Sequence, residues 1–496
     1  MGGTDQAEVK TAAGVVQSAS PADHGGAYAF LGVPYADPPI GEHRLAAPVP
    51  ATAWNGVRCC ETYGATAPQP AQGFTIIPEP IVAGDNCLNL NVFTPDPSSS
   101  AGLPVFVWIH GGGFVNGCNA SPWYHGRSFC RDGIVVVAVN YRLGIEGFLP
   151  LRGAPANRAL LDWLLALEWV QDNISGFGGD PTTVTIGGQS AGGAACATLL
   201  AVPRARGLFH GAILMSGTAN YVRTVDDASR FAERVANELG TDPTQEAFSA
   251  IDDAKLVEVQ QALGGVRDSV DGGTDVASRF AAMAKGGLRY GPLIDGDLLP
   301  EPPLDALRSG GSRDVPVMVG TTAEEVDALA NFAGDLDDAT LLDALERAGM
   351  AATDAMDYRA AHSAEAPARV LGRAMTDVMF RVPAVRVAEG HSGRSTFAYE
   401  SQWRSPTGFG AVHCLDVPFV FDVLDAPAVD VVAGDEPPRS LADEMHGAWS
   451  QFIRDGAPAW TPYDSGDRVV MAFDAPASGV IADPHANCRA RFRGFR

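Results

Sequence analysis

Short apolar runs alternate with amphipathic segments through most of the chain. The runs are rich in β-branched residues and end in glycines or small polar residues, as buried strands do. They lie at residues 104–109, 133–139, 183–188, 210–217, 314–322 and 395–401. Between Ala156 and Asn173, apolar residues recur instead at steps of three and four, which predicts one face of a helix. This alternation predicts βαβ units and an α/β fold with a mostly parallel sheet.

The chain is longer than one α/β unit of this kind needs, with 496 residues. The excess falls in two polar or Ala-rich stretches that look helical, near 221–290 and 335–390. No Pro- or Ser-rich linker separates either stretch from the strands. We therefore interpret residues 1–496 as a single domain with two large helical insertions.

Composition and net charge limit the kinds of molecule that we expect the protein to bind. The chain has 35 basic and 59 acidic residues, a net charge of -24 and no basic patch, so we expect no nucleic-acid partner. The N-terminus lacks a secretory signal, and no apolar run is long enough to cross a bilayer. We therefore expect a cytoplasmic protein without a membrane contact, as a monomer or small homo-oligomer.

The eight cysteines are scattered along the chain. They form no pair of CxxC motifs, so we expect no zinc site. Free cysteine packs as a small hydrophobe, so we expect most of them to be reduced core residues.

A serine stands among small residues in TIGGQSAGG, at 185–193, after a predicted strand and before a predicted helix. The segment Gly188 to Gly192 fits G-x-S-x-G, the pattern of a nucleophile elbow. In such an elbow the serine has strained backbone angles, and the flanking residues must be small because strand and helix lie close together. Ser190 is therefore a candidate nucleophile; the alternative is a plain glycine-rich turn.

A second glycine-rich segment, HGGGF at 110–114, follows an earlier predicted strand. Acyl-transfer intermediates carry an oxyanion, and backbone N–H groups aimed at it are a large catalytic term. Glycines let such N–H groups approach without obstructing side chains. The segment is thus a candidate oxyanion loop, and we expect His110 to shape it rather than transfer protons.

Several ordered motifs together resemble the type-B carboxylesterase/cholinesterase family of α/β-hydrolases, including its bacterial para-nitrobenzyl-esterase-like members. The resemblance covers almost the whole chain. It is carried by FLGVPYADPPIGEHRL, DNCLNLNVFTP, WIHGGGF, NYRLGIEGFL, FGGDPTTVTIGGQSAGG, GPLIDGDLLP and GAVHCLDVPFVFD. It implies the α/β-hydrolase fold, with a mostly parallel sheet, flanking helices and helical insertions around an active-site gorge.

The resemblance also implies roles for individual residues. The catalytic acid is Glu325, in a block that usually reads G-x-x-x-D-E-G, and the base is His413. The oxyanion hole is formed by the N–H groups of Gly112, Gly113 and Ala191. The order Ser, acid, His is also the order of α/β-hydrolases in general. No metal or organic cofactor is implied. Spacing alone does not separate Glu325 from its neighbour Glu324, which we expect to be solvated.

This sequence departs from the family at three positions. Gln189 stands where the family commonly has Glu, which removes a negative charge beside the nucleophile and disfavours cationic substrates. Val326 replaces the usual glycine after the acid. Ala67 stands where the family often has the cysteine that bonds the one matching Cys87, so we expect no such disulfide. Pairing of Cys87 with Cys59 or Cys60 remains the alternative.

These features predict a serine hydrolase that cleaves a small-molecule carboxylic ester. Two alternatives stay open: the same triad acting mainly on a carbamate, amide or lactone, and a non-catalytic binding protein of cholinesterase type. We expect the pocket walls to come from residues 76–84, from the insertion at 265–290 and from the region around Trp403. The sequence does not identify the substrate.

Overall fold

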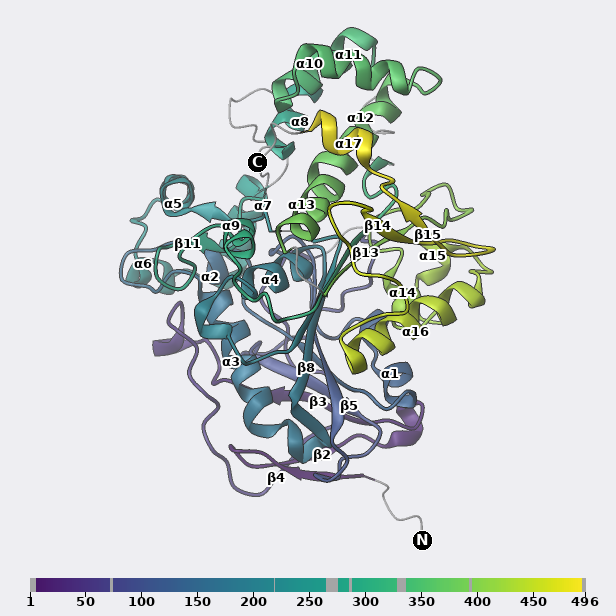
Figure 1. Cartoon of the computed structure of the whole chain (residues 1–496). Helices are drawn as coiled ribbons and strands as arrows, with labels where there is room; N and C mark the ends of the chain where they lie inside the picture. The colour runs from purple at the N-terminus through teal and green to yellow at the C-terminus, as the bar shows by residue number, and fades with distance from the viewer. Residues whose placement is uncertain are drawn as a thin grey trace.

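A ten-stranded sheet forms the centre of the molecule, with its strands in the order β15-β14-β13-β12-β9-β8-β6-β7-β5-β3 (Figure 1). The computed structural model describes residues 6–71, 75–217, 219–264, 275–284, 288–327, 336–391 and 395–492. In chain order the strands are β3 (Tyr28–Pro34), β5 (Asn89–Thr94), β6 (Leu103–Ile109), β7 (Val135–Val139), β8 (Gly179–Gln189), β9 (Gly211–Met215), β12 (Val317–Thr322), β13 (Thr396–Ser401), β14 (Val469–Phe473) and β15 (Gly479–Ala482).

Seven neighbouring strands of this sheet, β14, β13, β12, β9, β8, β6 and β7, are parallel to one another, which confirms the predicted α/β class. Each predicted apolar run coincides with one of them. The antiparallel strands β3, β5 and β15 at the two ends of the sheet were not predicted. In β5 the reason is clear: all six positions are buried, but Asn89, Asn91 and Thr94 interrupt the apolar pattern. Their polar groups are satisfied locally; Asn91, for example, donates to the backbone O of Asn119 at 2.9 Å.

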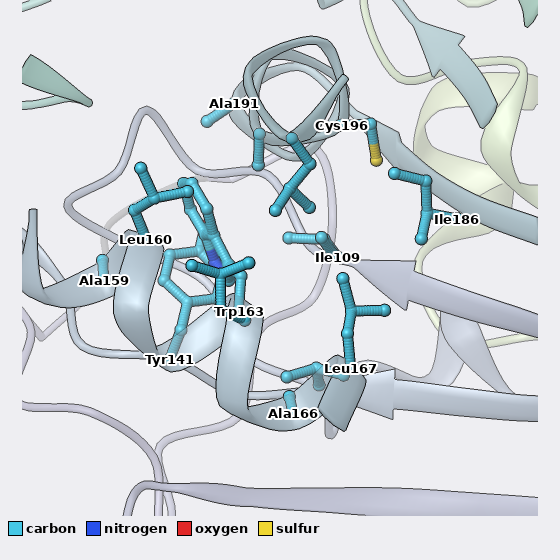
Figure 2. Close-up of a cluster of buried hydrophobic side chains, with 14 of the residues drawn as sticks. Ile109, Tyr141, Ala159, Leu160, Trp163, Ala166, Leu167, Ile186, Ala191 and Cys196 are labelled. Atoms are coloured by element: carbon cyan, nitrogen blue, oxygen red, sulfur yellow. The ribbon is translucent and has the colours of Figure 1, made fainter. Parts of the chain in front are cut away.

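Alternate residues of β6 point to opposite faces of the sheet, and each face has its own hydrophobic core. Val105, Val107 and Ile109 lie in the core beneath α3 (Arg158–Asn173) and α4 (Ala191–Leu199). Figure 2 shows Trp163 and Leu167 of α3 facing Ile109 and Ile186 there. The amphipathic stretch from 156 to 173 is thus the helix that its spacing predicts.

The opposite face of the sheet is covered by late parts of the chain. Phe106 and Trp108 of β6 share a second core with α1 (Arg127–Arg131), α14 (Val417–Val420) and α16 (Arg439–Asp455). Residues more than 300 positions apart therefore pack together around this part of the sheet.

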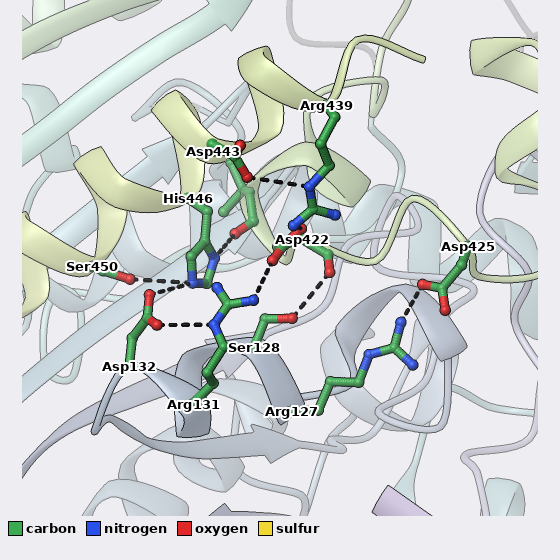
Figure 3. Close-up of polar contacts among 11 residues, drawn as sticks. Arg127, Ser128, Arg131, Asp132, Asp422, Asp425, Arg439, Asp443, His446 and Ser450 are labelled. Atoms are coloured by element: carbon green, nitrogen blue, oxygen red, sulfur yellow. Dashed lines mark hydrogen bonds and ion pairs between the residues drawn. The ribbon is translucent and has the colours of Figure 1, made fainter. Parts of the chain in front are cut away.

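A polar cluster joins α16 to α1 at the edge of this second core (Figure 3). Arg131 and Arg439 both pair with Asp422, at 2.8 and 2.5 Å. His446 lies 3.0 Å from an Asp132 carboxylate oxygen through Nε2, and 2.7 Å from the backbone O of Val420 through Nδ1. The His446 ring is buried and serves packing between the two helices.

Both predicted insertions are helical. The first contains α5 (Val225–Leu239), α6 (Gln245–Ser249), α7 (Asp253–Gly264) and α8 (Val276–Ala284). The second contains α10 (Asp338–Ala348), α11 (Ala352–Ala361), α12 (Pro367–Thr376), a π-helical turn (Asp377–Arg381) and α13 (Val382–Gly390). Helices α8, α10, α11 and α12 share a small core of their own at one end of the molecule (Figure 1).

The remaining elements are short. They are the small sheet of β1 (Glu8–Lys10), β2 (Val15–Ser18) and β4 (Val57–Cys60), the pair of β10 (Arg223–Thr224) and β11 (Leu293–Ile294), and the helices α2 (Gly144–Phe148), α9 (Pro303–Arg308), α15 (Val429–Ala433) and α17 (Ala486–Arg491). Within the described ranges, no helix is long and apolar enough to span a membrane, and no three His, Cys, Asp or Glu side chains group as metal ligands would.

All eight cysteines are free thiols. Cys87 is buried, and burial raises the pKa of its thiol, as it raises the pKa of Cys60 to about 12. Cys59 is the exposed member of the set. Since the thiolate is the reactive form, the buried thiols are expected to be inert.

We predict one fast-reacting thiol in the native protein, that of Cys59. Ellman's reagent should therefore release a single fast equivalent, and Cys59→Ser should abolish that phase. Reductant should leave the midpoint of thermal unfolding unchanged, because no cross-link constrains the unfolded chain. A non-reduced digest that joins Cys87 to Cys59 or Cys60 would contradict this.

Candidate active site

Ser190 lies at the point where β8 turns into α4. Its backbone angles are φ 58° and ψ -122°, which a residue with a side chain adopts only under strain. Two hydrogen bonds hold the turn: the Ser190 N–H donates to Met215 O at 2.8 Å, and Ser190 O accepts from the Ala194 N–H at 3.0 Å. The serine is half-buried, whereas Gln189 and Ala191 on either side are buried.

The glycines around Ser190 are required by close approach of the backbone. A Cβ on Gly192 would lie 1.9 Å from Ile109 O at the end of β6, and one on Gly188 would lie 2.4 Å from the Gly192 backbone. Any side chain at these two positions would force the strand and helix apart. This accounts for the small residues that the sequence places around the serine.

The candidate oxyanion loop follows β6 and passes next to the serine. A Cβ on Gly111 would lie 3.2 Å from Ser190 Cβ. Gly112 and Gly113 have positive φ values of 102° and 62°. Among the described residues, the N–H groups of Gly112, Gly113 and Ala191 donate to no protein acceptor. Three uncommitted backbone donors are therefore available beside Ser190.

Two contacts of the His110 ring support this loop. Its ring stacks on Tyr141 with centroids 4.5 Å apart, and its Nδ1 lies 2.9 Å from Gly111 O. Burial lowers the pKa of His110 to about 4, so the ring is neutral near pH 7. It is therefore a packing residue in a position that fixes the loop.

The structure brings Glu325 and His413 together. Glu325 is 1% exposed in the turn after β12, and its Oε1 accepts from the Thr322 N–H at 2.8 Å. Its Oε2 lies 2.5 Å from His413 Nδ1, and the His413 N–H donates to Glu325 O at 3.0 Å. A carboxylate at Nδ1 selects the neutral tautomer whose Nε2 carries the lone pair.

The surroundings of His413 also set its charge. Burial disfavours the charged ring, but Cys414 and the Glu325 carboxylate outweigh it and raise the pKa of His413 well above its usual range. The Phe380 ring, on the π-helical turn, covers the imidazole with centroids 4.9 Å apart. Within the described chain, no hydrogen bond joins Ser190 Oγ to His413; Gln189 Nε2 lies 3.1 Å from His413 Nε2 instead.

Glu324 is not solvated, contrary to the expectation from sequence. It is 4% exposed and pairs with Arg369 at 2.9 Å and Arg404 at 2.6 Å. It also accepts from the Ala411 N–H at 3.1 Å, while its own N–H donates to Ala411 O at 3.0 Å. Through its bonds to Ala411, Glu324 therefore fastens the segment that leads to His413.

Sequence reasoning missed another carboxyl group close to the site. Asp416 is fully buried and accepts from the Tyr399 hydroxyl at 3.3 Å. Burial and the nearby Glu325 raise the pKa of Asp416 to about 7. The available signal was an acidic residue just before the apolar run VPFVF.

The expected pocket walls are placed only in part. Ile77 is buried in the second core, and Trp403 packs on Phe419 with centroids 5.3 Å apart. Residues 265–274 and 285–287 of the wall expected at 265–290 lie outside the described residues. Next to them, a Leu288 methyl group lies 3.9 Å from where a Cβ on Gly113 would stand, so Leu288 borders the oxyanion loop.

Comparison with known proteins identifies the family of this chain. Residues 5–486 match the model of the carboxylesterase family. The chain is 32% identical to the para-nitrobenzyl esterase of Bacillus subtilis, over 94% of this chain and 95% of that one. It is 33% identical to the phenmedipham hydrolase of Pseudarthrobacter oxydans, over 92% and 94% of the two chains.

A solved structure of similar extent is that of a carboxylesterase from Geobacillus stearothermophilus. It superposes with a TM-score of 0.85 at 31% identity, over 99% of this chain and 100% of that one. The agreement extends over both chains, so the large parallel sheet and its flanking helices have the α/β-hydrolase arrangement. The protein belongs to the carboxylesterase family, whose members hydrolyse carboxylic esters.

Proposed function

We propose that this carboxylesterase works through a Ser-His-Glu triad and a covalent acyl-enzyme, with Ser190 as nucleophile, His413 as base and Glu325 as orienting acid. The observation that carries the proposal is the 2.5 Å contact between His413 Nδ1 and the buried Glu325 carboxylate. Gln189, which precedes the strained Ser190, contacts the same imidazole ring. In this proposal residues 1–496 form one catalytic domain with two helical insertions.

Acylation begins when neutral His413 takes the Ser190 proton at Nε2 as Oγ attacks the ester carbonyl. Glu325 keeps the ring in the required tautomer and stabilises the imidazolium. The N–H groups of Gly112, Gly113 and Ala191 donate to the oxyanion that forms on the carbonyl oxygen. His413 then gives its proton to the leaving alcohol, which leaves the acyl group on Ser190.

Deacylation repeats these steps with water. His413 takes a proton from water, the hydroxide attacks the acyl carbonyl, and the proton returns to Ser190 as the acid departs. The triad supplies nucleophile, base and charge stabilisation without a cofactor.

The substrate is a small carboxylic ester in this proposal. One relative of similar length is named a phenmedipham hydrolase and not an esterase. A carbamate, amide or lactone therefore stays the second candidate class of substrate. A purely binding role is disfavoured because the nucleophile, acid and base residues are all present. A hydrolysis panel that varies acyl length and alcohol size independently, with matched carbamates, decides among these.

Replacing Ser190 by Ala should leave the protein folded and reduce ester hydrolysis by about four to six orders of magnitude. A fluorophosphonate probe should label the wild type once, at Ser190. The matched control is Ser99→Ala, at an exposed serine, which should keep full activity and labelling. Labelling at another residue, or an active Ser190→Ala protein, would remove Ser190 from the mechanism.

Glu325→Gln should lower kcat by about 10⁴, because the imidazole loses its charge partner and its tautomer control. Glu324→Gln should lower kcat by less than about tenfold, since its amide oxygen still accepts from the Ala411 N–H. It should lower the unfolding midpoint, however, because two arginine pairs lose their anion. The reverse order of kcat values would show that Glu324 is the orienting acid. We do not assign this role to Asp295, another acidic residue between Ser190 and His413 in the chain, because its carboxylate accepts from the Asn157 amide and from the N–H groups of Asp297 and Leu299.

The pH profile of kcat/KM should rise through an apparent pKa above the ordinary histidine value of about 6.5. The sign follows from the raised pKa of His413: the neutral base forms only as pH exceeds that value, so activity is lost as pH falls through it. Initial rates between pH 5.5 and pH 9 would measure this. A limb well below the ordinary histidine value would contradict the role of Glu325 as its charge partner.

A further inference from the structure

A cavity separate from the proposed triad lies where the second helical insertion meets the C-terminal helix α17. Its volume is about 440 Å³, within the range of about 300–1,000 Å³ that is usual for small-molecule sites. Its lining includes Glu324, the chain neighbour of Glu325, but within the described chain it includes neither Ser190 nor His413. A molecule bound there would therefore not occupy the position of the ester substrate.

Three parts of the chain that are distant in sequence form the walls of this cavity. The second insertion contributes α11, α12 and the π-helical turn, the ends of β12 and β13 contribute a second wall, and α17 contributes the third (Figure 1). Part of the lining is apolar, from Ala323, Ala361 and Pro484. The cavity is open to solvent, since the side chain of Arg404 in its lining is 58% exposed. A small organic molecule can therefore enter it.

The charged side chains of the lining leave an excess of one positive charge, when its two histidines are counted as neutral. They are four arginines and three carboxylates: Arg373, Arg381, Arg404, Arg491, Glu324, Asp377 and Glu400. Burial lowers the pKa of His485, which favours its neutral form. The net charge of the whole chain is -24, so a local excess of positive charge stands out and favours an anion as the ligand.

The three carboxylates of the lining already have partners within the protein. Asp377 and Glu400 both pair with the buried Arg381, the second of them at 3.1 Å. Glu324 pairs with Arg404 at 2.6 Å. Because the protein itself compensates these negative charges, the cavity does not have the character of a cation site.

Two arginines of the lining, by contrast, retain unused hydrogen-bond donors. A guanidinium group has five N–H donors, and the contact that the structure gives the Arg404 side chain is the one with Glu324. The side chain of Arg491, the last residue of α17, makes no hydrogen bond or ion pair with any described residue. The planar fork of an arginine matches the two oxygens of a carboxylate, so both side chains are suited to bind one.

We propose that this cavity binds a small organic monocarboxylate, with the carboxylate on Arg404 and Arg491 and the apolar body against Ala323, Ala361 and Pro484. One carboxylate matches the excess of one positive charge. A dianion such as a phosphate monoester would leave a negative charge without a partner in a partly buried site. Hydrolysis of a carboxylic ester releases an acid of this chemical class, so products of the family's reaction are candidate ligands.

The test is a ¹⁹F NMR titration of 4-fluorobenzoate at pH 8 and constant ionic strength, on protein whose active site a fluorophosphonate has labelled. Saturable binding of about one equivalent is expected. The neutral 4-fluorobenzamide should not bind, because it lacks the charge that the arginines recognise. The dianionic 4-fluorophenylphosphonate should bind more weakly than the benzoate. The proposal is wrong if the benzoate does not saturate, if the amide binds equally well, or if the phosphonate binds more tightly.

Variants of the two arginines test where the benzoate binds. Arg404→Gln and Arg491→Gln should each weaken binding about five- to tenfold, because each removes a charge-assisted hydrogen bond. Arg404→Lys keeps a charge beside Glu324 but loses the fork, so it should weaken binding as well and replaces Arg404→Gln if that variant folds poorly. Arg206→Gln is the matched control, at an exposed arginine outside the cavity, and should leave the affinity unchanged. Wild-type affinity in both Arg491→Gln and Arg404→Lys would overturn the proposal.

This result can be separated from the fate of the proposed triad. If the fluorophosphonate labels a residue other than Ser190, the triad proposal fails, whereas weaker binding in the arginine variants still supports the carboxylate site. If the label is on Ser190 and the arginine variants bind benzoate as the wild type does, only the inference on the cavity fails.

Discussion

The backbone at Ser190 is the constraint from which the rest of the site follows. A φ of 58° on a residue with a side chain costs on the order of 1–3 kcal/mol. The hydrogen bonds from Ser190 N–H to Met215 O and from Ala194 N–H to Ser190 O hold the turn in this conformation. The close contact of Gly192 with Ile109 O ties the elbow to the strand that continues into the oxyanion loop. One crossing of strand and helix thus places both the proposed nucleophile and the uncommitted N–H donors.

The positions of the proposed acid and base depend on a second junction. Strands β12 and β13 are neighbours in the sheet, and the Ala323 N–H donates to Ser401 O where they end. Beyond that point, the reciprocal Glu324–Ala411 bonds and the His413–Glu325 backbone bond align two loops that are far apart in sequence. The contact between His413 Nδ1 and the Glu325 carboxylate is the last of this series, so its geometry derives from backbone pairing as much as from the side chains.

Sequence alone predicted the residues that chemistry makes distinctive. The glycines around Ser190 and in the 110–114 loop are informative because close backbone approach admits no other residue. By contrast, the burial of Glu324 depends on Arg369 and Arg404, and the position of Gln189 depends on the ring of a residue on a distant loop. Strand β5 was missed for a related reason, since its asparagines are satisfied by partners that only the fold brings near.

The second core has a consequence for synthesis on the ribosome. Trp108 and Phe106 are made early, whereas the helix that covers them, α16, ends at Asp455. At about 5–20 residues per second, that apolar face waits roughly 20–70 seconds for its cover. While residues 191–412 are being made, the nascent chain contains the proposed nucleophile Ser190 but not yet the proposed base His413, so its apolar face is exposed before the proposed triad exists. Molecular chaperones that shield apolar surface would act on this protein chiefly in that interval, before α16 is complete.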